Sequence, residues 1–278
     1  MDIDVLKYFK TVARLGNMSR AAQELHVSQP TLTVAIRKLE EMLGATLLER
    51  SKKGVRLTEA GLQIYQYSEQ MLALWEEMVR EAGSNEQTVR GTLRLGAHPS
   101  VARYTLPVFL PTLLKNQPQL NVQLVHDLSR HILQMIRDGL LDAGLVMNPE
   151  RHPDLVIKEI CSDEVTVWKK KGAAVNDTLI FDPSLFQAQT ILERLNKKGV
   201  RYARHIPSSN LEVIASLLHA GAGHAVLPKR VLLSTAGIEE AHPVLASFKD
   251  SLCLVYRPSL KKTALGRTFI DAVMAARF

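Results

Sequence analysis

The apolar residues of the first 57 positions recur every three or four residues, and polar turns divide them into three short runs. Such spacing places them on one face of a helix, so each run predicts an amphipathic helix. Two alanines in the second run would let neighbouring helices approach closely. The residues expected to face a shared core are Val5, Leu6, Phe9, Val12 and Ala13, then Ala21, Ala22 and Leu25, and finally Leu32, Ile36, Leu39 and Leu43.

Residues that start or stop helices stand at the boundaries of these runs. Gly16 can end the first helix, and Ser19 can cap the second. Ser28 can cap the third helix, with Pro30 in its first turn, where a missing N–H group does no harm. Gly44 can end that helix. Two helices joined by a short turn predict a helix-turn-helix unit.

Two short apolar runs follow at 46–50 and 55–57, around a basic turn at 51–54. Apolar runs on either side of a Gly-containing polar turn predict a β-hairpin. Beside a helix-turn-helix, this hairpin would form a wing. We therefore expect residues 1–57 to be a winged helix-turn-helix domain.

The third helix carries polar and basic side chains away from its apolar stripe. Gln29 stands at the helix start, where side chains reach base edges in the major groove, and its amide can pair bidentately with adenine. Thr33 can contact a phosphate or a base, while Arg37 and Lys38 suit phosphates. The residues predicted to bind double-stranded DNA are Ser28, Gln29, Pro30, Thr31, Thr33, Arg37, Lys38, Arg50, Lys52 and Lys53.

Charge alone gives this hypothesis little support. The chain has a formal net charge of +7, but residues 1–60 hold only ten Lys and Arg against seven Asp and Glu. A three-helix unit with scattered basic residues can also be a packing module without a nucleic-acid partner. The DNA-binding hypothesis therefore depends on the pattern of residues rather than on their charge.

Residues 58–90 predict a long helix that ends in a polar hinge at 83–90. Thr58 can cap this helix, and Glu59 lies near its positive end. Its apolar and small residues recur at heptad spacing, which indicates a dimer seam; the alternative is a helix that packs on its own domain. The heptad positions are Tyr65, Leu72 and Val79, with Ser68, Trp75 and Ala82 at the intermediate spacing and Ile64, Met71 and Met78 beside them.

From residue 91 onward, strand and helix patterns alternate, which indicates a parallel sheet covered by helices. The pattern restarts after a passage at 155–169, and a final strand and helix return. Residues 91–278 therefore predict two α/β lobes joined by two crossings, lobe I at about 91–162 and 253–278 and lobe II at about 163–252. The expected strands are 92–97, 120–126, 143–147, 179–181, 199–204, 224–227 and 252–257, and the expected helices are 100–116, 129–139, 184–196, 209–220 and 260–277.

The N-terminal stretch closely resembles the LysR-type transcriptional regulators of bacteria. The residues that carry the resemblance are Phe9, Val12, Ala13, Gly16, Ser19-Arg20-Ala21-Ala22, Leu25, Ser28-Gln29-Pro30, Ile36, Leu39-Glu40, Leu43-Gly44, Leu47, Arg50, Leu57-Thr58 and Ala60-Gly61. The chain departs from the family pattern at Val34-Ala35 on the recognition helix, at Leu48 before the wing, and in a short second lobe. Val34 puts one base or phosphate contact in doubt.

The resemblance extends over the whole chain and implies its architecture. A winged helix-turn-helix would be followed by a long linker helix and by a two-lobe α/β effector domain like that of periplasmic binding proteins. The resemblance also implies a homodimer through the linker helix, a homotetramer built from two dimers, and a partly palindromic promoter site. A small-molecule effector would bind between the lobes, and RNA polymerase is a further candidate partner.

Polar residues that follow strands or begin helices are the candidate effector contacts. His98 and Ser100 join the first strand to the first helix, whose N-terminus attracts anions. For each hydroxyl, simple helix capping is the alternative. The excess of twenty-three Lys and Arg over sixteen Asp and Glu in residues 91–278 fits an anionic effector. The predicted effector-binding residues are His98, Ser100, Ser129, Asn148, His205, Ser208 and Asn210.

The remaining features exclude several classes of protein. No phosphate-binding glycine loop, nucleophile elbow or metal-ligand spacing occurs, so we expect neither an enzyme nor a cofactor or metal. No apolar run is long enough for a membrane span, and the N-terminus is no signal peptide, so we expect a cytoplasmic protein. Cys161 and Cys253 stand near the expected crossings. They are expected to be reduced and buried, and a redox pair is the alternative.

Overall fold

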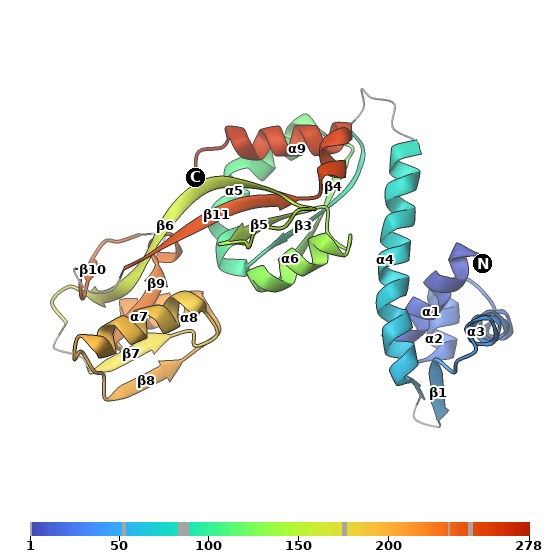
Figure 1. The fold of residues 1–278 in the computed structure, drawn as a ribbon, viewed down its shortest axis with the longest axis horizontal. Coiled ribbons are helices and arrows are strands. Elements are labelled where there is room, and N and C mark those ends of the chain that lie inside the picture. The colour runs from blue at the N-terminus through green and yellow to red at the C-terminus, as the bar shows by residue number, and fades with distance from the viewer. Residues whose placement is uncertain (1, 52–53, 83–88, 174–176, 233, 244–246) are drawn as a thin grey trace. The chain divides into compact units, whose positions relative to one another are not determined.

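The computed structural model describes residues 2–51, 54–82, 89–173, 177–232, 234–243 and 247–278. Lys52 and Lys53, and residues 83–88 of the expected hinge, lie outside this range. The chain divides into two units (Figure 1). The first contains Met1–Asn85 and Asp138–Leu140, and the second contains Glu86–Arg137 and Leu141–Phe278. Each unit is described by itself below.

The first unit begins with three helices, α1 (Ile3–Leu15), α2 (Met18–Glu24) and α3 (Gln29–Leu43). The glycines that end α1 and α3 have φ values of 59° and 65°, in the left-handed region that favours glycine. Ser28 caps α3 as expected. The expected cap of α2 was wrong: Asn17 rather than Ser19 caps it, because the Asn17 side-chain oxygen accepts from the amides of Ser19 and Arg20.

A hairpin of β1 (Leu48–Ser51) and β2 (Gly54–Leu57) follows, and it confirms the predicted wing. One carboxylate ties this hairpin to α3, since Oε1 of Glu40 accepts from the amides of Leu47 at 2.8 Å and Leu48 at 3.1 Å. The buried core confirms most of the predicted inward residues, including Phe9, Leu32 and Ile36. Leu43 is an exception: it lies in the last turn of α3 and is exposed.

The long helix α4 (Glu59–Ala82) shows that the expected heptad does not form one continuous free face. Leu72 is buried in the core of its own domain, Tyr65 packs against that core, and Ser68 is also buried. With Ile64, which packs against the same core, four of the nine predicted seam residues are therefore used within the chain. Four other members of the predicted seam, Met71, Trp75, Met78 and Val79, are exposed, and together with Tyr67 and Leu74 they form an exposed apolar stripe on α4.

The second unit contains one sheet whose strand order is β4-β3-β5-β11-β6-β9-β7-β8, with β10 paired to β6. In lobe I, the parallel strands β3 (Gly91–Ala97), β4 (Leu120–His126) and β5 (Ala143–Met147) lie at one end. Their apolar residues pack against α5 (Pro99–Asn116) and α9 (Ala264–Ala275) on one face and against α6 (Ser129–Arg137) on the other. A short 3-10 helix, η2 (Pro258–Lys262), precedes α9.

Lobe II occupies the other end of the sheet (Figure 1). It contains β7 (Thr178–Phe181), β8 (Arg204–Pro207), β9 (His224–Pro228) and β10 (Ile238–Glu240). Two separate apolar clusters hold α7 (Phe186–Lys197) and α8 (Leu211–Ala220) against the strands. The short helix η1 (Lys229–Leu232) follows β9. The strand expected at 199–204 was placed too early, because β8 begins at Arg204.

Two long antiparallel strands, β6 (Val156–Lys170) and β11 (Phe248–Tyr256), run through both lobes. The first half of β6 pairs only with β11, whereas its second half also pairs with β9 and β10. The expected passage at 155–169 is therefore one continuous strand. Their register shifts between Leu252 and Cys253, which is the mark of a β-bulge. Within the part of the chain described, no helix is both long and apolar enough to cross a membrane.

Candidate functional site

The predicted DNA-binding face is accessible on α3. Gln29, Pro30, Thr31, Arg37 and Lys38 are exposed, as is the cap residue Ser28, while Thr33 is half-buried. Oε1 of Gln29 accepts from the Ser19 hydroxyl at 3.1 Å, so α2 orients this amide at the helix start. Gln29, Pro30 and Thr31 lie in the first turn of α3, and Arg37 and Lys38 lie farther along the same helix.

Two features of this face could not be read from the sequence. Nε of Arg37 donates to Oε1 of Glu41 at 2.9 Å, and both side chains are well exposed. An exposed pair of this kind contributes little, so a phosphate can compete with Glu41 for Arg37. Val34 is 54% exposed, which leaves a β-branched apolar group on the reading face. Arg50 is exposed on β1, where it pairs with Val55.

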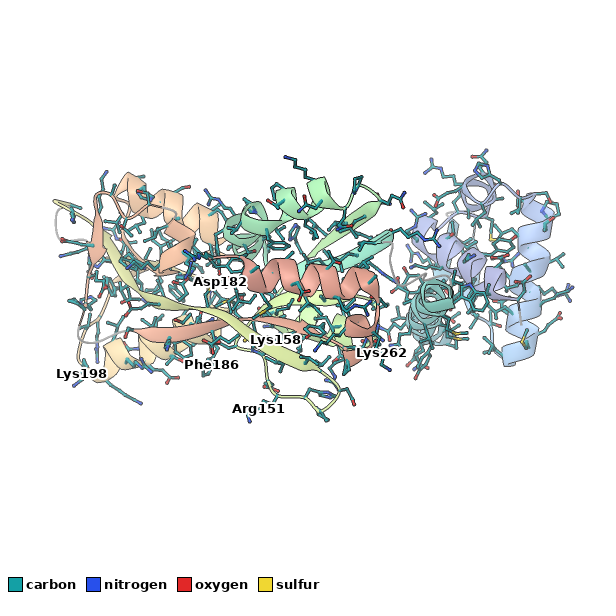
Figure 2. The ribbon with its side chains drawn as sticks, turned by 90° about the horizontal axis from the view of Figure 1, so that it is seen from above. Arg151, Lys158, Asp182, Phe186, Lys198 and Lys262 are labelled. Atoms are coloured by element: carbon teal, nitrogen blue, oxygen red, sulfur yellow. The ribbon has the colours of Figure 1, made fainter. Side chains whose placement is uncertain are left out.

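The second unit contains a cavity of about 700 Å³ where lobe I and lobe II meet along β6 and β11. This volume lies within the range of small-molecule sites. Four of the predicted effector residues line it: His98, Ser100, Ser129 and Asn148. Phe186, at the start of α7, lines it from lobe II (Figure 2). Most of the other lining side chains are apolar, among them Val101, Leu133, Val146, Leu185, Leu211 and Val231.

Ser100 is the most informative of these residues. Its side chain is 2% exposed, and its Oγ atom has no hydrogen-bond partner among the described residues. Simple capping does not explain Ser100, because His98 caps α5: Nδ1 of His98 accepts from the Ser100 amide at 3.3 Å. Burial lowers the pKa of His98, which favours the neutral imidazole that can accept this bond. The Ser100 hydroxyl is thus left available in the cavity wall.

Ser129 and Asn148 have structural partners at the end of β5. The Ser129 hydroxyl accepts from the amide of Met147 at 3.1 Å. Asn148 has a φ of 45°, and its Oδ1 atom accepts from the amide of Ser251 at 2.8 Å. Its Nδ2 atom donates to Oδ1 of Asp250 at 2.6 Å. Asn148 therefore fastens the end of β5 to β11.

Asp250 is a lining residue that sequence reasoning missed. It is 1% exposed, and both of its carboxylate oxygens lie 3.0 Å from Nε2 of Gln187 on α7. Burial raises the pKa of Asp250, although the bonds from Asn148 and Gln187 oppose that rise. Nothing in the local sequence distinguishes this Asp from a surface residue. Only the pairing of β11 with β5 and β6 brings it to the cavity.

The other three predicted effector residues do not belong to the cavity wall. His205 is exposed on β8, and its ring packs edge-on against Phe181. Asn210 caps α8 by accepting from the amide of Val213 at 3.0 Å, and the Ser208 hydroxyl accepts from the amide of Asn210. Each of these side chains thus has a local structural partner, and the cavity reaches α8 at Leu211 instead.

Cys161 and Cys253 are both free, on the paired strands β6 and β11; Cys253 is buried as expected, whereas Cys161 is only half-buried. Burial raises the pKa of each thiol. Raised values keep both sulfurs protonated at neutral pH, which disfavours the redox alternative because the thiolate is the reactive form. Among the described residues, no group of three or more His, Cys, Asp or Glu side chains could hold a metal ion.

Comparison with known proteins gives the same division of the chain. The model of the bacterial regulatory helix-turn-helix protein, lysR family, matches residues 3–62. The model of the LysR substrate binding domain matches residues 86–277. The HTH-type transcriptional regulator YofA of Bacillus subtilis (strain 168) is 27% identical over 98% of both chains. The hydrogen peroxide-inducible genes activator of Pectobacterium carotovorum subsp. carotovorum is 26% identical over 95% of this chain and 88% of its own length.

Solved structures show the same fold. CbnR, a LysR family transcriptional regulator, has a TM-score of 0.68 at 23% identity and matches 98% of both chains. Full-length CbnR complexed with its target DNA also has a TM-score of 0.68, at 24% identity, and matches 98% of this chain and 99% of that one. A full-length OxyR from Pseudomonas aeruginosa has a TM-score of 0.67 at 24% identity, over 99% of this chain and 93% of that chain.

Proposed function

The chain belongs to the LysR family of transcriptional regulators, and we propose that a small molecule held between its two lobes controls how it binds a promoter. It is a DNA-binding transcriptional regulator with an effector domain, and its relatives are regulators rather than enzymes. As a promoter-binding protein, it would work in the cytoplasm, where RNA polymerase is its candidate partner.

We propose that Gln29 reads a base while Arg37 and Lys38 position the domain on phosphates. The exposed amide at the start of α3 and the exposed cations farther along support this division. Ser28, Pro30, Thr31 and Thr33 would line the same interface, and Arg50 would contact the backbone through the wing. Lys52 and Lys53 stay predictions from the sequence, because they lie outside the described residues.

We propose that the exposed apolar stripe on α4 forms the dimer seam. Met71, Leu74 and Met78 are spaced three and four residues apart, so they lie on one side of the helix. An apolar stripe of this length on a long helix is typical of helix–helix association. Two such dimers would form the homotetramer, and the two-fold symmetry of each dimer would match a partly palindromic site.

We propose that the effector binds in the cavity lined by His98, Ser100, Ser129 and Asn148 and changes the angle between the lobes. The unpartnered, buried hydroxyl of Ser100 is the observation that carries this proposal. A buried polar atom without a partner is costly, so a ligand that bonds to it is stabilised at this point. A shift in the lobe angle would alter the spacing of the DNA-binding domains in the assembly.

A gel-shift titration of the full chain on the DNA upstream of its own gene, at two salt concentrations, tests the regulatory role. We expect sequence-selective binding that weakens as salt increases, because phosphate contacts release counterions. Binding with no preference over scrambled DNA would contradict the proposed reading of a promoter. Effector action is tested separately, by the Ser100 substitution argued in the Discussion.

A further inference from the structure

One acidic side chain in the effector cavity has no cationic partner. Asp250 lies on β11, is 1% exposed, and lines the cavity. Among the residues that the structure describes, its carboxylate accepts from the neutral amides of Asn148 and Gln187 alone, at 2.6 and 3.0 Å. None of the ion pairs within 4.0 Å among the described residues includes Asp250. Buried carboxylates are ordinarily paired with a cation or neutralised, so this site lacks a positive group.

The surroundings of the cavity add to this negative field. Asp182, which directly follows β7, is 2% exposed, and its Oδ2 atom has no hydrogen-bond partner among the described residues. Burial lowers the pKa of His98 and is the largest effect on it. The negative charges of Glu212 and Asp182 raise that pKa in the opposite direction. The two arginines in the cavity wall, Arg130 and Arg137, are exposed on α6. Solvent therefore screens their charges more than that of Asp250.

The hydrogen bond from Gln187 to Asp250 occupies a position that a donor group of a ligand could take. A single nitrogen, Nε2, lies 3.0 Å from both carboxylate oxygens, so one donor group is shared between two acceptors. A protonated amine in that position has three donors and a full positive charge. An ammonium group adds a direct attraction between opposite charges that the neutral Gln187 amide lacks, so an amine can displace that amide.

We propose that the effector carries a protonated nitrogen that binds Asp250, together with an oxygen that accepts from the Ser100 hydroxyl. The inference deepens the proposed function, because it rests on the same cavity being the effector site. Zwitterionic amino acids are the simplest molecules with both groups. Their carboxylate suits the start of α5, where Ser100 lies, and their side chain suits the apolar wall. An effector that carries only negative charge would leave the buried charge of Asp250 without a positive partner.

The position of Asp250 also explains how such a ligand would act on the protein. Asn148 holds the carboxylate from the end of β5 in lobe I, whereas Gln187 holds it from α7 in lobe II. An amine that replaces Gln187 would release α7 from β11 and form its own bridge between the lobes. Ligand binding and the lobe angle would thus be coupled at one carboxylate.

Thermal-shift and calorimetric titrations of the full chain test the inference. The probes are the proteinogenic amino acids and, for each one, the carboxylic acid that lacks the amino group. We expect at least one amino acid to raise the melting temperature while its deaminated partner does not. The Asp250→Asn variant should bind that amino acid at least about 30-fold more weakly, because a buried charge pair is broken. Asp271→Asn is the control, since Asp271 is an exposed carboxyl on α9 that does not line the cavity.

Gln187→Lys keeps the test decisive if Asp250→Asn does not fold. The new ammonium group would form an ion pair with the Asp250 carboxylate. This variant should therefore be more stable than the parent, and amino acids should no longer raise its melting temperature. The inference is overturned if only deaminated acids bind, if Gln187→Lys responds like the parent, or if no member of either set binds. Selective promoter binding in the same preparation distinguishes this failure from a failure of the proposed function.

Discussion

Nδ2 of Asn148 lies 2.6 Å from Oδ1 of Asp250, across 102 positions of sequence. The backbone strengthens the link, because the Asn148 amide donates to the Ser251 carbonyl at 2.9 Å and the Ser251 amide donates to Oδ1 of Asn148 at 2.8 Å. Asn148 adopts a φ of 45°, which is uncommon outside glycine. The end of β5 and the start of β11 are therefore held as one rigid unit in the cavity wall.

The raised pKa of Asp250 predicts a pH-dependent effect of Asp250→Asn on stability. Because the folded pKa lies above the unfolded one, the parent's Asp250 contributes most at low pH, and this contribution is lost as pH rises through the folded value. Asparagine does not titrate. We therefore expect the stability of the variant relative to the parent to be lowest at acidic pH and to rise toward neutral pH.

Denaturant unfolding of the parent and of Asp250→Asn, from acidic to neutral pH, measures the difference in their free energies of unfolding. Asp271→Asn removes an exposed carboxyl on α9 and should leave the shape of the parent's curve unchanged. A stability difference between Asp250→Asn and the parent that stays constant with pH would show that the carboxylate carries no burial penalty.

Ser100→Ala should abolish the effector response without weakening DNA binding. The Ser100 hydroxyl makes no hydrogen bond among the described residues, so its removal should leave the melting temperature of the free protein unchanged or slightly higher. Ser129→Ala is the matched comparison, because its hydroxyl accepts from the Met147 amide; we expect a loss of about 1 kcal/mol. Promoter binding of each variant with and without a binding amino acid gives the readout. A normal response from Ser100→Ala would remove Ser100 from the site.

Gln29→Ala and Arg37→Ala should damage DNA binding in different ways. Gln29→Ala removes a base-reading amide, so it should relax selectivity at one position by about 1–3 kcal/mol. Arg37→Ala should weaken binding to all sequences and reduce the salt slope by about one. Glu41→Ala serves as the control that keeps Arg37 but frees it from its 2.9 Å partner, and it should not weaken binding. Competition binding with mutated DNA sites at several salt concentrations separates the loss of selectivity from the general weakening. An equal loss of selectivity in both variants would contradict the different roles of Gln29 and Arg37.

Leu74→Glu should dissociate the dimer, because it places a charge within the exposed apolar stripe of α4. Leu72→Ala, two residues earlier, should instead lower stability by about 2–5 kcal/mol and leave the assembly intact, because Leu72 belongs to the domain core. Gln66→Glu, at an exposed polar position of the same helix, controls for added charge. Light scattering after size exclusion reports the mass of each variant. A Leu74→Glu protein with the parent's mass would rule out this stripe as the seam.

The first unit was predictable in most of its detail from the sequence, because its signals are local. The apolar stripes of α1 and α3 are encoded within a few turns, and Ser28 and Gly44 act on backbone groups within four residues. Asn17 shows the limit of that reasoning, since Asn17 and Ser19 could each cap α2 and only the geometry selects Asn17.

The tertiary structure decided which residues meet. A heptad on α4 is compatible with a dimer seam or with an internal contact, and packing against α1 selected the internal role for Leu72. In the effector cavity, Ser100 was predictable because it follows a strand and begins a helix. Asp250 was not, and His205 was placed there wrongly, because their surroundings depend on strand pairings across the whole second unit. Local sequence therefore determined the helices, caps and wing. The positions of charges in the cavity were decided by long-range pairing, whose energy depends on partners a hundred residues away.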